Sequence, residues 1–295
     1  MELTEIYKRF NTQKKCISYL EEKRWYSKPI CPYCESNKHS SRKNENRYNC
    51  NTCKRSYSVL VGTFFESTKL PLTKWFMAIV LILNAKKGIS SLQLGRDLGI
   101  NRKTAWYLQK RIRSAMKNDD VVLSGIVEVD ETYIGGSLIK MQNKRKQNND
   151  KFQKAGMEHK LPVLGMVQRN GKVILQVINK AWGREIQPIL KSRITQDSTI
   201  VTDGFGGYYN LGAWFDNHIV LNHVRHIRSK GIYHTNMIEG IWTTIKRAIM
   251  GQYHKLSENH MQSYLNEIAF KYNNRERKKA FNLLVNSLLK TVKCH

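Results

Sequence analysis

Apolar residues recur at helical spacing in the first half of the chain. An apolar run over residues 71–85 predicts one helix, and the shorter segment 91–98 predicts another. In the shorter helix, Leu92, Leu94 and Leu98 are the residues expected to point inward. This part of the chain is therefore expected to contain a small helical domain.

Polar residues mark where these helices begin and end. Ser90 or Ser91 can cap the short helix, and a glycine-containing turn at residues 98–100 follows it. Asn101 is the expected cap of the next helix, residues 102–116. A short helix, a tight turn and a second helix form the pattern of a helix-turn-helix.

Beyond residue 118 the apolar pattern changes from the helical period to the alternation that is typical of strands. The tripeptide Arg169-Asn170-Gly171 between two apolar runs indicates a β-hairpin. The expected strands are residues 125–134, 161–168, 172–178, 198–203 and 218–222. The expected helices are residues 184–194 and a last helix capped by Thr235 or Asn236.

Three antiparallel strands, a helix, two more strands and a helix are the order of an α/β domain with an RNase H-like fold. In that fold the first strand lies centrally, beside the fourth. Four parts are expected along the chain. They are an N-terminal helix with a ribbon (1–62), a helix-turn-helix domain (63–118), the RNase H-like domain (119–280) with a polar insert loop (137–160), and a C-terminal helical tail (281–295).

The net charge of the chain indicates what kind of molecule it binds. The 295 residues include 50 Lys and Arg against 23 Asp and Glu, a net charge of +27. This excess is spread over the whole chain and favours a polyanion, most simply double-stranded DNA. The longest apolar run, Trp75 to Leu83, is too short to cross a bilayer, and the acidic start lacks the apolar core of a signal peptide. We expect no membrane association, with the protein at the nucleoid of a bacterial host or in the nucleus of a eukaryotic one.

Four of the six cysteines form two C-x2-C pairs, Cys31 with Cys34 and Cys50 with Cys53. Each pair can lie on a tight turn, so that the four sulfurs bind one zinc ion tetrahedrally. A site with four protein ligands has no open position for a substrate, so this zinc is expected to be structural. Residues 42–49 between the pairs are expected to form a strand, as in a zinc ribbon.

The helix expected over residues 102–116 is strongly basic. The second helix of a helix-turn-helix enters the major groove, so its basic side chains are expected to contact DNA. A plain helical hairpin with a solvated basic face is the alternative. The residues concerned are Arg102, Lys103, Lys110, Arg111 and Arg113.

Acidic residues occupy three related places in the strand-rich part. Asp130 lies in its first strand, Asp203 ends its fourth, and Glu239 lies near the start of its last helix. If the first and fourth strands are neighbours, the two aspartates project side by side and Glu239 can reach the same edge. Glu131, which follows Asp130 along the strand, is expected to point outward.

Three carboxylates at one place repel one another unless cations bind, and their hard oxygen atoms suit Mg²⁺ or Mn²⁺. Two such ions, roughly 3.5–4 Å apart, can activate an attacking hydroxyl and stabilise the leaving oxygen of a phosphate diester. Attack by water nicks DNA, whereas attack by a freed 3′-hydroxyl joins it to another strand. The residues therefore predict phosphoryl transfer on DNA with two Mg²⁺ or Mn²⁺ ions, beside one structural zinc ion.

At these residues the chain resembles the DDE transposases of bacterial insertion sequences that carry an N-terminal zinc ribbon, the ISXO-like group related to Merlin elements. The matching motifs are VEVDETYIGG at residues 127–136, TDG at 202–204, and HTNMIEG at 234–240 with Lys246 and Arg247 after it. Residues 26–34 and 270–275 also fit, so the resemblance covers nearly the whole chain.

The resemblance implies that Asp130, Asp203 and Glu239 form a catalytic triad. It implies an enzyme that binds terminal inverted repeats, cleaves DNA at the element ends and joins them to target DNA. Lys246 resembles a trailing lysine that contacts a DNA phosphate near the site, and an exposed helix lysine is the alternative. Because two DNA ends must be held together, at least a dimer is expected on DNA.

Other interpretations remain open. Asn236, one helical turn before Glu239, can cap the helix or assist the site. His223, His226 and His234 can form a zinc site or hold a phosphate, although hydrogen-bonded or solvated histidines are simpler. The chain can also be a DNA-binding regulator whose transposase domain is inactive, or a structure-specific nuclease.

Overall fold

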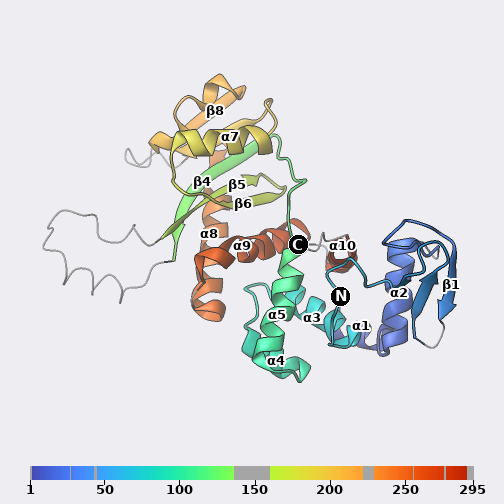
Figure 1. The fold of residues 1–295 in the computed structure, drawn as a ribbon. Helices are drawn as coiled ribbons and strands as arrows, with labels where there is room; N and C mark the ends of the chain where they lie inside the picture. Colours follow the sequence, from blue (N-terminus) through green and yellow to red (C-terminus); the bar gives the residue numbers. More distant parts are fainter. Residues whose placement is uncertain are drawn as a thin grey trace, which may run out of the picture. The chain divides into compact units, whose positions relative to one another are not determined.

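The computed structural model describes residues 2–26, 28–42, 45–135, 160–221, 229–254, 256–275 and 277–290, the last range without the side chains at 277 and 278. The chain divides into two compact units (Figure 1). One contains the chain up to Lys117 together with the chain from Asn274 onward, and the other is Asn118–Asn273. All of the predicted insert loop except Lys160, and also His223 and His226, lies outside the described residues.

A three-stranded antiparallel sheet carries the cysteine pairs in the first unit. Its strands, in the order β1-β2-β3, are β1 (His39–Arg42), β2 (Arg47–Cys50) and β3 (Ser56–Tyr57). The prediction of a single strand over residues 42–49 is wrong, because the chain reverses there. Arg42 pairs with Arg47 across the reversal, and Asn46 takes the left-handed conformation (φ 51°) that such a turn requires.

Helices form the rest of the first unit: α1 (Leu3–Arg9), α2 (Gln13–Trp25), α3 (Leu72–Asn84), α4 (Ser91–Leu98), α5 (Arg102–Ser114) and α10 (Arg277–Leu289). An aromatic cluster of Phe10, Tyr19, Phe76 and Phe281 joins four segments of this core. The ring centroids of Phe10 and Phe76 are 4.7 Å apart, and those of Phe76 and Phe281 are 5.7 Å apart. The C-terminal helix is therefore part of a core and not the tail that the sequence predicts, because Phe281 is fully buried.

The predicted caps of α4 and α5 are confirmed. The Ser90 hydroxyl accepts a hydrogen bond from the Gln93 N–H (3.1 Å), and the Asn101 side chain accepts one from the Thr104 N–H (2.8 Å). Between the helices, Gly99 has a left-handed φ of 59°.

Only part of the predicted inward face of α4 is confirmed. Leu94 and Leu98, four residues apart, are buried, whereas Leu92 is 49% exposed. Leu92 lies two residues before Leu94 and so on the opposite side of the helix, where the prediction was wrong.

The second unit is built on a five-stranded mixed sheet in the order β6-β5-β4-β7-β8. The predicted central strand, β4, pairs antiparallel with β5 and parallel with β7, so the first and fourth strands are neighbours as expected. The hairpin at Arg169-Asn170-Gly171 joins β5 to β6. The strands are β4 (Ile126–Ile134), β5 (Leu161–Gln168), β6 (Val173–Val177), β7 (Thr199–Asp203) and β8 (Asn217–Leu221).

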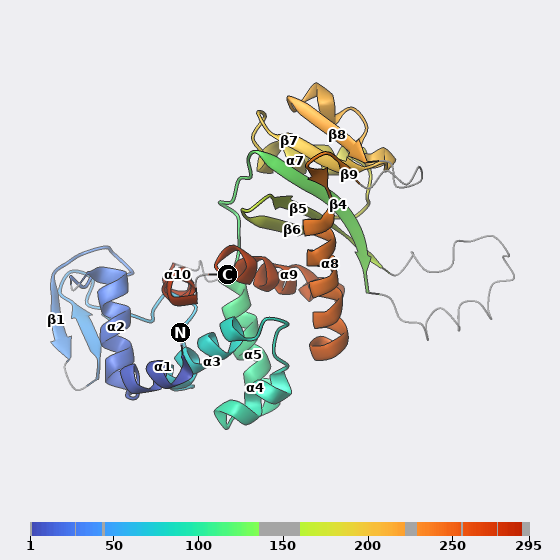
Figure 2. The same ribbon diagram turned by 180° about the vertical axis from the view of Figure 1, so that it is seen from behind.

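Helices cover both faces of this sheet (Figures 1 and 2). On one face, Ile186 and Leu190 of α7 (Gly183–Arg193) pack against apolar side chains of β4, β5 and β7. On the other face lie α8 (Asn236–Ala248) and α9 (Glu258–Asn273). Both faces of β4 are therefore packed against helices, although residues 130–133 stay partly exposed, and this decides where its acidic residues can point.

Shorter elements complete the second unit. They are the 3-10 turns η1 (Gly206–Tyr208) and η2 (Leu211–Ala213), the strands β9 (Ser229–Lys230) and β10 (Tyr233–His234), and a π-helical turn, η4 (Ile249–Tyr253), at the end of α8. In the ranges that the structure describes, no helix has both the length and the apolar character needed to cross a membrane.

Candidate active site

Strand β4 presents acidic residues to both faces of the sheet. Asp130 pairs with Gly165 of β5, where an added Cβ would lie 2.6 Å from Ile238 and Trp242 of α8. Asp130 therefore faces α8, and Glu128, two residues earlier, faces the same way. Glu131 lies on the opposite face. The alternation of the strand thus separates the two neighbouring acids at 130 and 131.

The carboxylate of Asp130 is partly buried against α8. Its Oδ2 accepts a hydrogen bond of 2.7 Å from the indole Nε1 of Trp242. Burial raises the pKa of Asp130, and the charges of Asp203 and Glu239 raise it further, while the indole bond lowers it. The three predicted carboxylates are therefore close enough to interact electrostatically.

Asp203 lies at the carboxyl end of β7. The parallel register pairs Glu128 with Val201, so its extension by two residues places Asp203 level with Asp130 on the same face. The Asp203 Oδ1 accepts a hydrogen bond of 3.0 Å from the Phe205 N–H. This bond orients the carboxylate as the chain leaves the strand.

Glu239 is exposed in the first turn of α8. Its Oε1 accepts a hydrogen bond of 3.1 Å from the hydroxyl of Thr235, which is the N-cap residue of the helix. Asn236 is consequently the first helical residue and not the cap. Among the described residues, the one group with three or more ligand atoms within 4.8 Å of one another is the cysteine cluster, so the three carboxylates are less tightly gathered.

The prediction that Glu131 points outward is wrong, because α7 and η1 cover that face. Glu131 Oε2 accepts a hydrogen bond of 2.5 Å from the hydroxyl of Tyr208, which is 1% exposed. Burial raises the pKa of Glu131 to about 7, against the effect of the Tyr208 bond, which lowers it.

Glu128 is fully buried on the same face, and its role in the site was not predicted from the sequence. Its Oε2 accepts hydrogen bonds from the N–H groups of Met237 (2.9 Å) and Ile238 (3.1 Å), and its Oε1 accepts one from Arg169 (3.0 Å). His234 Nδ1 lies 3.4 Å from the same carboxylate. Glu128 lies two residues before Asp130 in a strand, so the alternation of the strand could have placed both acids on the same face.

The four cysteines form a single cluster in the first unit, as predicted. Their Sγ atoms all lie within 4.8 Å of one another, with Cys31 to Cys53 at 3.7 Å and Cys34 to Cys50 at 3.5 Å. Tetrahedral zinc with Zn–S bonds of about 2.3 Å separates its sulfurs by about 3.8 Å, so the cluster fits a zinc ion. The Cys53 N–H donates a hydrogen bond to the Cys50 Sγ and lowers the pKa of Cys50, while the neighbouring thiols raise the pKa of Cys34.

The segment with the three carboxylates and the segment with the four cysteines each match a known protein family. Residues 122–273 match the ISXO2-like transposase domain, and residues 11–56 match the transposase zinc-ribbon domain. The chain belongs to the ISXO2-like transposase family. The cluster of four cysteines is therefore the metal site of a zinc ribbon and supports a structural Zn²⁺ ion.

Two relatives have names that connect them to transposition. A protein in transposable element ISH50 of Halobacterium salinarum is 25% identical over 269 residues, which cover 88% of this chain and 90% of that protein. A transposase-like protein of Haemophilus influenzae is 27% identical over 113 residues, which cover 38% of this chain and 90% of that protein.

The basic residues of helix α5 in this transposase lie on two different faces. Arg102, Lys103 and Lys110 are exposed, and they share that side with Tyr107, which is 51% exposed and was not predicted. Arg113 is 2% exposed, so its predicted contact with DNA is wrong: it lies on the packed face of the helix.

The side chain of Arg111 makes contacts within the first unit. Its Nη2 donates a hydrogen bond of 2.6 Å to the Glu66 carbonyl, and its guanidinium lies 5.4 Å from the centre of the Trp75 ring. Burial lowers the pKa of Arg111. On α8 of the other unit, Lys246 and Arg247 are both exposed, and Lys246 follows Glu239 by two helical turns.

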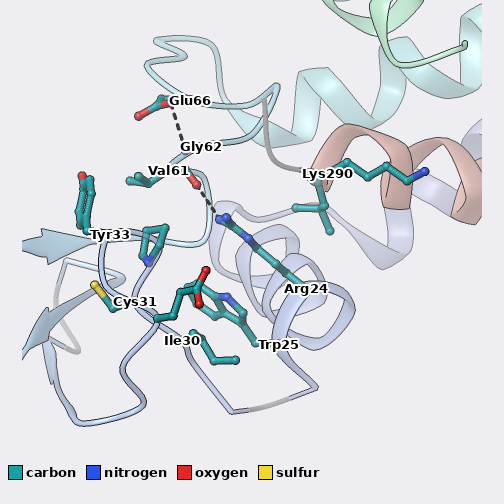
Figure 3. A pocket seen from close by; sticks show the side chains of 12 residues that line it. Arg24, Trp25, Ile30, Cys31, Tyr33, Val61, Gly62, Glu66 and Lys290 are labelled. Atoms are coloured by element: carbon teal, nitrogen blue, oxygen red, sulfur yellow. Dashed lines mark hydrogen bonds between the residues drawn. The ribbon is translucent and has the colours of Figure 1, made fainter. Parts of the chain in front are cut away.

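The first unit also contains a pocket of about 770 Å³ beside the zinc ribbon (Figure 3). Arg24 Nη1 reaches over it and donates hydrogen bonds of 2.7 Å to the carbonyls of both Val59 and Val61. The Glu66 carboxylate accepts a bond of 3.1 Å from the Gly62 N–H. These charged groups hold the segment after β3, and every residue that lines the pocket belongs to the unit without the three carboxylates.

Proposed function

We propose that the protein is a DNA transposase that cleaves DNA at the ends of its element and joins the 3′-hydroxyl ends to target DNA. The observation that carries this proposal is the placement of Asp130, Asp203 and Glu239 in a transposase-family domain. The first two stand level on neighbouring parallel strands, and the helix that carries the third is hydrogen-bonded to the first strand. The strand order also supports an RNase H-like fold for this domain.

The donor set fits hard divalent cations. Asp130, Asp203 and Glu239 offer only carboxylate oxygens, and their mutual repulsion is part of what raises the pKa of Asp130. Two Mg²⁺ or Mn²⁺ ions held by these residues would supply activation of the attacking hydroxyl and stabilisation of the leaving oxygen.

The remaining residues orient the triad and the DNA. Trp242 fixes one oxygen of Asp130, the Phe205 N–H fixes one of Asp203, and Thr235 fixes one of Glu239. Pre-arranged groups of this kind lower the cost of reaching the transition state. Lys246 and Arg247, exposed on the helix of Glu239, are suited to contact DNA phosphates.

DNA recognition is assigned to the first unit. Helices α4 and α5, joined through Gly99, have the order and caps of a helix-turn-helix, and α5 exposes Arg102, Lys103 and Lys110. Terminal inverted repeats are the DNA that such a module would select. Because two element ends must meet for joining, the active form is expected to be a dimer or a larger assembly.

The test compares purified wild type with Asp130→Asn on labelled DNA that contains the element ends, in Mg²⁺ and in Mn²⁺. We expect cleaved and joined products from the wild type and none from the variant. Asp197→Asn is the matched control, since Asp197 is an exposed acid just before β7. Tight, salt-sensitive binding by the wild type with no cleavage in either metal would instead indicate a DNA-binding regulator.

A further inference from the structure

We infer that Glu128 is a positioning residue that fixes the helix of Glu239 to the strand of Asp130 and so sets the distance between the two carboxylates. This inference rests on the proposed function for its consequence in catalysis, but its structural basis is independent. Glu128 lies on β4 and bonds to α8, the two elements that carry these acids.

The first turn of α8 depends on Glu128 because the side chain of the cap residue, Thr235, accepts no hydrogen bond from the helix backbone. The first N–H groups of a helix lack partners inside it and are usually satisfied by the N-cap side chain. Here the Thr235 hydroxyl donates to Glu239, and no cap bond from the Thr235 side chain forms. The Glu128 carboxylate accepts from Met237 and Ile238 in its place.

Charge strengthens this contact. A carboxylate at a helix N-terminus is stabilised by the helix dipole, and its hydrogen bonds are stronger than those of a neutral acceptor. Glu128 is fully buried and would be costly there without compensation. Arg169, from the β5–β6 hairpin, supplies that compensation through its bond of 3.0 Å to Oε1.

Glu128 is not itself placed to bind a metal ion. One of its oxygens accepts two backbone N–H groups, and the other accepts the Arg169 guanidinium. Its function in the site therefore has to act through the helix that it holds.

The geometry explains why the distance between the acids would be sensitive to Glu128. Helix α8 is bonded to β4 at two places: to Glu128 at residues 237 and 238, and to Asp130 at Trp242. Glu239 lies between these two attachments. If the first attachment is lost, the end of the helix that carries Glu239 is held less firmly relative to Asp130, by the packing of Ile238 without these hydrogen bonds.

The main test is Glu128→Gln, which keeps the shape of the side chain and removes its charge. Residues that orient metal ligands typically contribute about 10- to 100-fold in metal affinity or activity. We expect Mn²⁺ affinity, measured by the spin resonance of free Mn²⁺, to fall about 10-fold, and kcat for cleavage to fall similarly. The KM for DNA should change less than kcat does, because helices α4 and α5, which are proposed to select the DNA, belong to the other unit.

Glu185→Gln is the matched control. Glu185 also accepts two backbone N–H groups, from Asn179 (2.7 Å) and Lys180 (2.9 Å), but it lies on α7, on the other face of the sheet. It should lose local stability without any change in Mn²⁺ affinity. If Glu128→Gln fails to fold, Glu128→Asp tests the same point, since it keeps the charge for Arg169 but withdraws the carboxylate from α8.

Amide hydrogen exchange over residues 236–239 separates the two proposals. Faster exchange there in Glu128→Gln, by about 10-fold or more, supports the docking of α8 whatever the catalytic result. Unchanged exchange, or Mn²⁺ binding and cleavage within twofold of wild type in a folded variant, overturns the inference. A wild type that neither binds Mn²⁺ nor cleaves DNA overturns the proposed function. In that case the exchange measurement still tests whether Glu128 holds α8 against β4.

Discussion

The indole Nε1 of Trp242 donates a hydrogen bond of 2.7 Å to the Oδ2 of Asp130. The two residues come from different elements, α8 and β4, and Trp242 follows Glu239 by one helical turn. Gly165 on β5 makes this contact possible, because any Cβ there would lie 2.6 Å from the Trp242 ring. A small residue on one strand thus allows a helix to reach an acid on the next.

Replacement of Trp242 by Phe removes the donor and keeps most of the apolar ring. Because the indole bond lowers the pKa of Asp130, its loss should raise that pKa. The acid limb of the pH–rate profile for cleavage should then move to higher pH. An unmoved acid limb would show that the bond does not affect the ionised form of Asp130.

Gly165→Ala should destabilise the second unit by about 1–3 kcal/mol, because the added methyl group meets Ile238 and Trp242 in a packed interface. Gly240→Ala is the paired control. A Cβ at Gly240 meets nothing within 4 Å, and alanine favours the helix by up to about 1 kcal/mol. Thermal unfolding should therefore move in opposite directions for the two variants, and equal shifts would contradict the packing described for Gly165.

Glu131 should make the stability of the second unit depend on pH. Its pKa is raised to about 7, so the folded state holds this proton more firmly than the unfolded state does. The stabilisation is complete below the ordinary pKa of 4.5 and is lost as the pH rises through about 7. Glu131→Gln cannot titrate and should lack this decline, a difference on the order of 1 kcal/mol at pH 8 once solvent exposure is considered.

Thermal unfolding between pH 4.5 and pH 8, in buffer without Mg²⁺ or Mn²⁺, measures this difference. Tyr208→Phe provides the complementary test. The Tyr208 bond lowers the pKa of Glu131, so its removal should move the decline to higher pH. Parallel stability curves for wild type and Glu131→Gln would exclude this linkage.

Cys34→Ser should abolish zinc binding and unfold the ribbon of β1, β2 and β3. A small sheet of this kind buries little apolar area and depends on its metal for folding. Zinc content and hydrogen exchange of the ribbon report the two effects, while the second unit should keep its exchange protection. Cys16→Ser is the control, because Cys16 lies outside the cluster and bonds to the Phe10 carbonyl; it should retain one zinc ion per chain.

The exposed and buried basic residues of α5 should behave differently when replaced. Lys103→Ala and Lys110→Ala should weaken DNA binding and reduce the slope of log K against log salt by about 0.9 for each lost phosphate contact. Arg113→Ala should lower the melting temperature and leave that slope unchanged, since Arg113 is 2% exposed. A reduced salt slope in Arg113→Ala would contradict its placement in the core.

Short-range signals were sufficient for much of the secondary structure. Ser90 and Asn101 cap their helices through bonds to residues three positions away, and residues 169–171 reverse the chain between adjacent strands. The two C-x2-C pairs likewise predicted the cysteine cluster. The caps and the hairpin depend on interactions among near neighbours in the chain, and the cysteine cluster was predicted from the repeated spacing of its two pairs.

What the sequence could not decide was which surfaces become covered. The alternation of β4 assigns Asp130 and Glu131 to opposite faces, but only the packing of α7 and η1 shows that Glu131 is hydrogen-bonded to Tyr208 instead of solvated. The burial of Phe281 has the same origin, because the rings of Phe10 and Phe76, distant in the chain, pack against it.

Glu128 illustrates this division most clearly. Its pattern in the strand is that of any acid that alternates with valines, yet it bonds to backbone groups 109 and 110 residues away. Patterns among neighbouring residues were enough to predict the local elements and the acids available to the site. The tertiary structure decided which acids face α8 and which of them hold that helix, since burial and long-range hydrogen bonds exist only once distant segments have packed together.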